Sequence, residues 1–96
     1  MKITLSPTVW NRTLSVSKAG DTLTINDKTF DFSGVADNGI LSAKDVGCEF
    51  IVDDVQRIGG DLQLTLLLPI GARASNSARF PDAIVDPADG PVQLPQ

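Results

Sequence analysis

The sequence predicts an all-β fold, a small antiparallel barrel or sandwich built from hairpins, with one short helical turn around residues 42–46. Apolar residues recur at every second position in several short stretches, which is the period of a strand with one buried face. Glycine, asparagine and aspartate, the residues of tight turns, separate these stretches. Eleven of the twelve carboxylates are aspartate, which favours turns and caps over helix interiors.

A chain of 96 residues has room for one domain, so residues 1–96 are expected to form a single β domain. The segment 71–79 lacks apolar periodicity and is predicted to be a mobile surface loop. Residues 82–96 hold two short apolar stretches around a turn, but Pro91 and Pro95 cannot donate to a ladder. We therefore predict an edge hairpin or a docked arm over residues 82–96.

The first strand is predicted at residues 2–5, followed by a turn around Trp10 and a three-stranded meander over residues 12–32. A two-residue turn at Ala19-Gly20 would begin the meander. It would pair Lys18 with Asp21, Val16 with Leu23, and Leu14 with Ile25. The first of these pairs would be an ion pair at the neck of the hairpin.

The second reversal of the meander falls at Asn26-Asp27-Lys28, because asparagine and aspartate tolerate left-handed backbone. Two registers remain open. A turn at Asn26-Asp27 pairs Leu23 with Phe30, whereas a turn at Asp27-Lys28 pairs Ile25 with Phe30 and Leu23 with Phe32. Both registers place the phenylalanines on the face that carries the leucine.

Residues 33–48 contain three glycines and are expected to form an irregular connection. Within this connection, Ser42 can accept a hydrogen bond from the amide three residues later, as the first residue of a helical turn does. This capping arrangement is the basis of the short helical turn predicted around residues 42–46.

The stretch QRIGGDLQLTLLLPIG predicts the second main hairpin, with its turn at Gly59-Gly60. Simple pairing across this turn would set Asp53 opposite Leu66 and bury a carboxylate among leucines. A bulge at Asp53-Asp54 avoids that cost. It would bring Val52 opposite Leu66 and Phe50 opposite Leu68, and leave Val55 opposite Leu64. Pro69 is expected to end the strand, because it cannot donate to a ladder.

The alternating positions of these hairpins define the predicted core. Its members are Leu14, Val16, Leu23, Ile25, Phe30, Phe32, Phe50, Val52, Val55, Leu62, Leu64, Leu66 and Leu68. Leu67 faces the other way, which suggests that this part of the strand is covered on both sides, as in a central strand.

Composition argues against several classes of function. The chain has no histidine, the commonest general base and metal ligand, and its single cysteine, Cys48, is expected to be a partly buried apolar side chain. The net charge is −4 and no Lys/Arg cluster occurs, which argues against nucleic-acid binding. The longest apolar run, Leu66–Leu68, is far below the ~18 residues of a spanning helix. We therefore predict no enzyme activity, no cofactor and no membrane partner, and the absence of an export signal favours the cytoplasm.

Asp53 and Asp54 are the only adjacent carboxylates, and such a pair can bind a cation or act in catalysis. Neighbouring residues on a strand point to opposite faces, so the two can share a site only through a bulge. A role in discouraging pairing between sheet edges is the favoured interpretation, and no catalytic or metal residue is assigned.

Four residues are candidates for an interaction surface: Trp10, Arg12, Arg79 and Phe80. Tryptophan is enriched at protein interfaces, where one end of its ring can stay wet. The favoured interpretation is that Trp10 closes one end of the barrel or sandwich. Arg79 and Phe80 could likewise form an interaction surface or pack on the core, and docking onto the core is the favoured interpretation.

The segments MKITLSP, LSVSKAGDTLTIN, FDFSG and GGDLQLTLLLPIG resemble small uncharacterised proteins encoded near the tail genes of proteobacterial phages and prophages. The resemblance spans the chain up to about Pro81 and carries no active-site residues. It implies a structural or assembly role in a phage tail, with other tail proteins or a second copy of the chain as partners. The implied location is the host cytoplasm during assembly, with the virion as a second one.

The leading hypothesis is therefore a non-enzymatic tail-associated protein that acts through protein-protein contacts. The alternative is a small carbohydrate- or ligand-binding β module. An exposed Trp10 in a groove beside carboxylates would favour the alternative.

Overall fold

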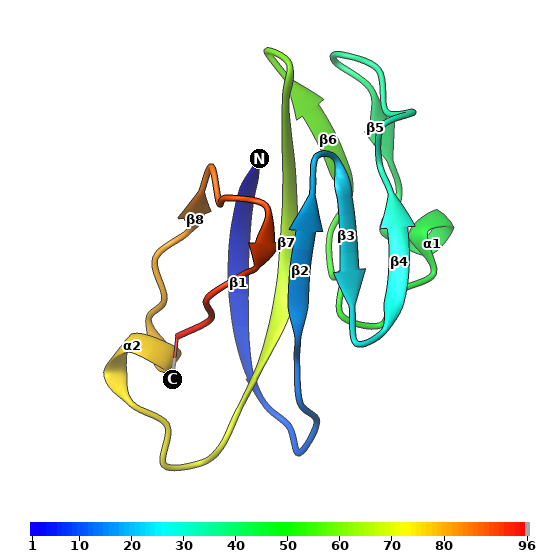
Figure 1. Ribbon diagram of the computed structural model, residues 1–96. Helices are drawn as coiled ribbons and strands as arrows, with labels where there is room; N and C mark the ends of the chain where they lie inside the picture. The colour runs from blue at the N-terminus through cyan, green and yellow to red at the C-terminus, as the bar shows by residue number, and fades with distance from the viewer. Residues whose placement is uncertain (96) are drawn as a thin grey trace.

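In the computed structural model, which describes residues 1–95, nine strands form two sheets that share one core (Figure 1). The five-stranded sheet has the order β5 (Ile40–Leu41), β6 (Val55–Ile58), β7 (Asp61–Ile70), β1 (Lys2–Val9), β8 (Ile84–Val85). The four-stranded sheet has the order β4 (Lys28–Asp31), β3 (Thr22–Ile25), β2 (Val16–Ala19), β9 (Gly90–Pro91). The all-β prediction is confirmed, and the fold is a sandwich in which the described strands do not close into a barrel.

The central pair of the five-stranded sheet, β1 and β7, is parallel, in contrast to the antiparallel pairing expected throughout. It is in register over eight residue pairs, from Lys2 with Gln63 to Val9 with Ile70. Parallel strands need a long connection, and here the whole meander and β5, α1 (Ala43–Val46) and β6 lie between them. β1 is also longer than the predicted strand at residues 2–5, because β7 supplies a partner along its full length.

The meander forms with a shifted first turn. Its first turn is Gly20-Asp21, which pairs Lys18 with Leu23 and Val16 with Ile25, so the predicted Ala19-Gly20 turn is wrong. Gly20 has φ +60°, and a type II′ turn requires glycine at its first central position. The second turn, Asn26-Asp27, pairs Leu23 with Phe30, which is one of the two predicted registers.

The hairpin β6–β7 turns at Gly59-Gly60 as predicted, with φ values of +57° and +80°. The pairing also slips at Asp53-Asp54, but by two residues. Ile51 and not Val52 lies opposite Leu66, and Phe50 accepts a bond from the amide of Leu67. The larger slip turns Val52 outward, 45% exposed, and keeps both aspartates out of the core.

Three prolines lie within strands, at positions where the ladder needs no amide. Pro69 is inside β7, which continues to Ile70, so the expectation that it ends the strand is wrong. The amide of Leu67 donates to Phe50, and alternation along the strand puts the backbone nitrogen of Pro69 on the same side of β7. The segment beside β7 turns at residues 48–51, so it needs no amide from position 69. Pro7 and Pro91 lie on the unpaired sides of β1 and β9, since the amides of Trp10 and Val92 bond to Ile70 and Val16 on the paired sides.

The core confirms most of the predicted set. Ten of the thirteen predicted members are buried, namely Val16, Leu23, Ile25, Phe32, Phe50, Val55, Leu62, Leu64, Leu66 and Leu68. Leu14 and Phe30 are partly buried against them, and only Val52 is exposed. The predicted core did not include five residues that are buried in the structure: Met1, Ile3, Leu5, Ile51 and Val92. Leu67 is half-buried on the outer face of the central strand β7.

The C-terminal part of the chain spans both sheets. The helical turn α2 (Asn76–Arg79), capped by Ser75, lies within the segment expected to be a loop. β8 then pairs with β1, and β9 pairs with β2, so these two strands join different sheets and form no hairpin with each other. This segment is an arm that runs along the edges of the sandwich. α1, with Ser42 as its cap, matches the predicted helical turn.

Because of the two-residue slip, we expect truncation of Ile51 to destabilise the protein much more than truncation of Val52. Ile51→Ala removes a buried side chain opposite Leu66 and should lower the free energy of unfolding by about 2–4 kcal/mol. Val52→Ala removes an exposed side chain and should cost about 0.5 kcal/mol or less. Urea denaturation of both variants measures the difference, and equal costs would contradict the observed register.

Candidate functional site

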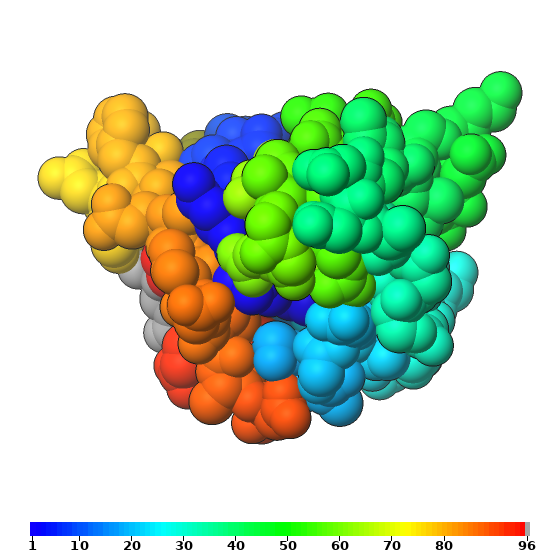
Figure 2. Space-filling view, turned by 90° about the horizontal axis from the view of Figure 1, so that it is seen from above, coloured from blue at the N-terminus to red at the C-terminus, as the bar shows by residue number. Residues whose placement is uncertain are grey.

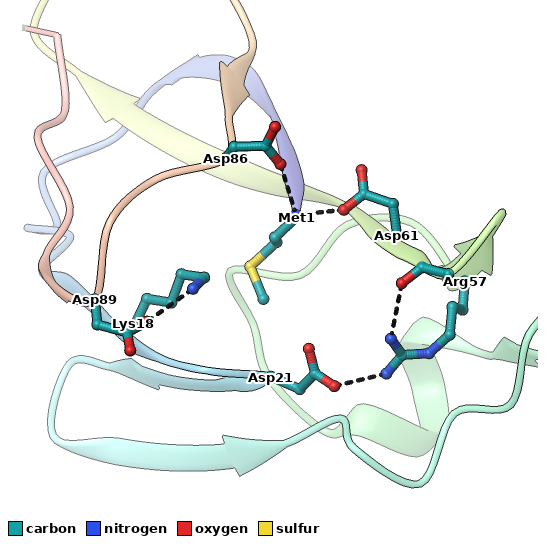
Figure 3. A network of polar contacts seen from close by, with 8 residues as sticks. Met1, Lys18, Asp21, Arg57, Asp61, Asp86 and Asp89 are labelled. Atoms are coloured by element: carbon teal, nitrogen blue, oxygen red, sulfur yellow. Dashed lines mark hydrogen bonds and ion pairs between the residues drawn. The ribbon is translucent and has the colours of Figure 1, made fainter.

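The two ends of the sandwich are closed by different chemistry. At one end, four ion pairs made by three cations hold segments that are distant in sequence (Figure 3). Lys18 on β2 pairs with Asp89 at 2.8 Å, Arg57 on β6 pairs with Asp21 at 2.9 Å, and the α-amino group of Met1 pairs with Asp61 and Asp86. These contacts join the five-stranded sheet to the turns of the four-stranded sheet and to the C-terminal arm.

Arg57 is the most connected side chain at this end. Its guanidinium donates to the carbonyls of Val35 at 2.6 Å, Gly60 at 3.1 Å and Phe32 at 3.3 Å, in addition to Asp21. The side chain is only 14% exposed. Arg57 therefore satisfies backbone acceptors from both sides of the sandwich, and its role is structural.

The opposite end is closed by two aromatic rings in contact and a cation. The rings of Trp10 and Phe50 lie 5.4 Å apart between centroids, tilted by 40°. The guanidinium of Arg12 lies over both rings, 4.9 Å from the Trp10 centroid and 5.6 Å from that of Phe50, and forms an ion pair with Glu49. Trp10 is half-buried against the core, which agrees with the favoured interpretation that it closes one end.

A cleft of about 280 Å³ opens beside this cation, between the β3–β4 hairpin and the segment after α1. Its lining consists of Arg12, Ile25, Asn26, Lys28, Phe30, Gly47, Cys48, Glu49 and Phe50. Trp10 lies behind Arg12 and Phe50 and is not part of the lining. Cys48 is half-buried on the wall of the cleft, as the sequence suggested.

The other candidate residues behave differently. Arg79 donates to the carbonyls of Ala72 and Ala74 and so braces its own loop. Phe80 is 78% exposed, so the expectation that it docks on the core is wrong, and Ala78 is buried in its place. Of the four candidates, only Trp10 and Arg12 lie together at one end of the sandwich.

The aspartate pair forms only local contacts. Asp53 accepts from the amide of Asp54, and Asp54 accepts from the amide of Ala43 at the start of α1. Residues 1–95 contain no group of three or more side chains suited to holding a metal ion. No helix in that same range has the length and hydrophobicity needed to cross a bilayer.

Comparison with known proteins finds no matching family model, no matching curated protein and no matching solved structure.

Several features of these sites had no signal in the sequence. Val9 is an exposed strand residue beyond the predicted first strand, and the inter-sheet role of Arg57 depends on residues that lie 22 to 36 positions away along the chain. The proximity of Arg12 to Lys28 and Glu49 likewise arises from packing. Of the residues proposed from the sequence, Trp10 and Arg12 lie at the end of the sandwich that holds the cleft.

Replacing Arg57 should unfold the sandwich more readily than replacing an exposed arginine. Arg57→Met leaves Asp21 and three backbone carbonyls without this donor and should lower the free energy of unfolding by about 2–4 kcal/mol. Arg79→Met, whose bonds stay within one loop, is the matched control and should cost about 1 kcal/mol or less. Similar costs in urea denaturation would contradict an inter-sheet role for Arg57.

Stability should fall above pH 8 through the α-amino group of Met1. The hydrogen bond to Asp61 raises the pKa of this group above its ordinary value of 8.0, with a smaller contribution from Asp86. The folded state therefore binds the proton more tightly, so this stabilisation is complete below pH 8 and is lost as the pH rises through the folded-state pKa. Urea midpoints measured from neutral to alkaline pH should fall less in Asp61→Asn than in the unaltered chain.

Proposed function

We propose that this protein is a non-enzymatic structural or assembly component of a phage or prophage tail, acting through protein-protein contacts. The observation that carries the contact-making role is the exposure of large apolar side chains on β1, on β8 and on the segment between α2 and β8. Val9 on β1, Phe80 after α2 and Val85 on β8 are 68%, 78% and 63% exposed. Figures 1 and 2 show α2 and the segment leading to β8 beside β1.

The backbone along this side supports the same proposal. β8 pairs with β1 only at Lys2 and Ile3, so the outer edge of β1 from Thr4 to Val9 has no strand partner among residues 1–95. An unpaired strand edge is a template for pairing with another chain. Pro7 removes one donor from this edge, which limits indiscriminate pairing while leaving the exposed apolar side chains available.

Composition and geometry support a non-enzymatic role. Because the sequence has no histidine, neither its serines nor Cys48 have a histidine base to activate them. The tail assignment itself rests on the resemblance of the four sequence segments to phage-encoded proteins. It implies other tail proteins or a second copy of the chain as partners, in the host cytoplasm during assembly and in the virion.

A ligand-binding β module is the second candidate, and the cleft beside Arg12 is the observation that favours it. Trp10 is half-buried behind the cleft, so the arrangement differs from an exposed tryptophan that stacks on a sugar. Any ligand would contact Arg12, Lys28 and the phenylalanines in place of the indole.

The proposed contact surface can be tested by co-purification of tagged protein from phage-producing cells, followed by mass spectrometry. We expect specific recovery of tail proteins or of untagged copies of the chain. Phe80→Ser should reduce that recovery about tenfold or more, because large apolar side chains dominate interface energies. Since Phe80 is exposed, stability should change little.

The matched control is Ile40→Ser on β5, at the opposite edge of the same sheet and also exposed. It should leave recovery unchanged. A strictly monomeric protein that recovers no virion component would contradict the tail proposal, and equal effects of both variants would contradict the choice of surface.

A further inference from the structure

We infer that the cleft between the β3–β4 hairpin and residues 47–50 binds a small organic acid, in which a carboxylate is carried by an aromatic or branched aliphatic group. This inference is independent of the tail proposal, since it concerns the end of the sandwich that Trp10 and Phe50 close. It names the ligand class of the second candidate function and rests on that candidate.

The cleft is positively charged on an otherwise acidic protein. The net charge of the chain is −4, yet two cations, Arg12 and Lys28, line the cleft against one carboxylate, Glu49. Lys28 forms no ion pair within residues 1–95 of the structure. The Asn26 amide is already engaged, because it donates to Thr13 and accepts from Ser15. Arg12 and Lys28 are therefore the donors that remain for an anion.

Arg12 is held in place before any ligand arrives. Its guanidinium lies over the rings of Trp10 and Phe50, and one of its terminal nitrogens donates to Glu49. A guanidinium has five N–H donors, so the others stay available for a planar carboxylate. The ring contacts and the ion pair restrict the position of the guanidinium, which lowers the entropic cost of binding.

Part of the lining of the cleft is apolar. It includes Ile25 and Phe50, which are buried, and Phe30, which is half-buried. The volume of about 280 Å³ is near the lower end of the range for ligand pockets, ~300–1,000 Å³. It suits one ring or branched chain attached to a carboxylate, because apolar side chains and two cations belong to the same lining.

Glu49 carries the negative charge that opposes an anionic ligand in the cleft. It pairs with Arg12 at the wall of the cleft, so an incoming anion meets its negative charge and competes for the same guanidinium. Neutralising Glu49 should therefore strengthen binding, whereas neutralising either cation should weaken it. A merely structural role of these residues does not predict that opposite change.

The probe for the experiment is 3-phenylpropionate, compared with its neutral analogue 3-phenylpropionamide. Trp10 is the single tryptophan and contacts Arg12, so its fluorescence reports on the cleft. We expect a saturable change with 3-phenylpropionate and binding at least about tenfold weaker with the amide. Amide NMR shifts should locate the site at Lys28, Gly47 and Cys48.

Three substitutions then test the assignment of roles. Arg12→Gln should weaken binding about tenfold, and Lys28→Gln about threefold. Glu49→Gln should strengthen binding about threefold. Lys44→Gln, which makes the same change of charge on exposed α1 outside the cleft, should leave the affinity unaltered.

Glu49→Gln keeps the test decisive if Arg12→Gln fails to fold, because a gain in affinity requires a folded site. Equal binding of the amide and the acid, or no gain in Glu49→Gln, would overturn the anion site. Binding of both compounds with equal affinity would still leave a ligand-binding module, whereas no saturable binding of either up to ~10 mM would remove that candidate too.

Discussion

The parallel pairing of β1 with β7 is the constraint on which the rest of the structure depends. It places Ile3 and Leu5 beside Leu64 and Leu66, and all four side chains are buried. The other three strands of that sheet extend from this pair, and the meander of the second sheet covers its apolar face. Because the two strands are about sixty residues apart in sequence, the intervening chain must form the second sheet and return before the central pair is complete.

The ends of the sandwich divide two tasks between them. At one end, Arg57 links the five-stranded sheet to the β2–β3 turn, while Lys18 and the α-amino group of Met1 link β2 and β1 to the C-terminal arm. Those contacts satisfy backbone and carboxylate acceptors, and so they leave little polar capacity for a ligand. The other end is closed by the tilted rings of Trp10 and Phe50. Of the two cations there, Arg12 forms an ion pair with Glu49, and Lys28 forms none within residues 1–95. The same need to seal an open sandwich therefore produces a structural end and an end with binding capacity.

The edges of the five-stranded sheet explain why contacts with other chains are the favoured role. Most of the outer edge of β1 has no strand partner among residues 1–95, and exposed Val9 lies at the end of that edge. Pro7 lies where its missing amide faces outward, and so it costs the sheet no hydrogen bond. An edge interrupted by proline favours binding of a specific partner over edge-to-edge aggregation. The cleft near Arg12 is at a different place, so the two proposed functions use separate surfaces.

The sequence by itself determined the fold class, the Gly59-Gly60 hairpin, the α1 cap and ten buried core positions, because each depends on local periodicity or turn chemistry. It also indicated a slip near Asp53, since burying that carboxylate would be costly, but not whether the slip was one residue or two. Only the tertiary structure decided the parallel β1–β7 pair, the outward turn of Val52 and the grouping of Arg12, Lys28 and Glu49. Those features arise from contacts between distant segments, and side-chain alternation within one strand holds no information about which strand will lie beside it.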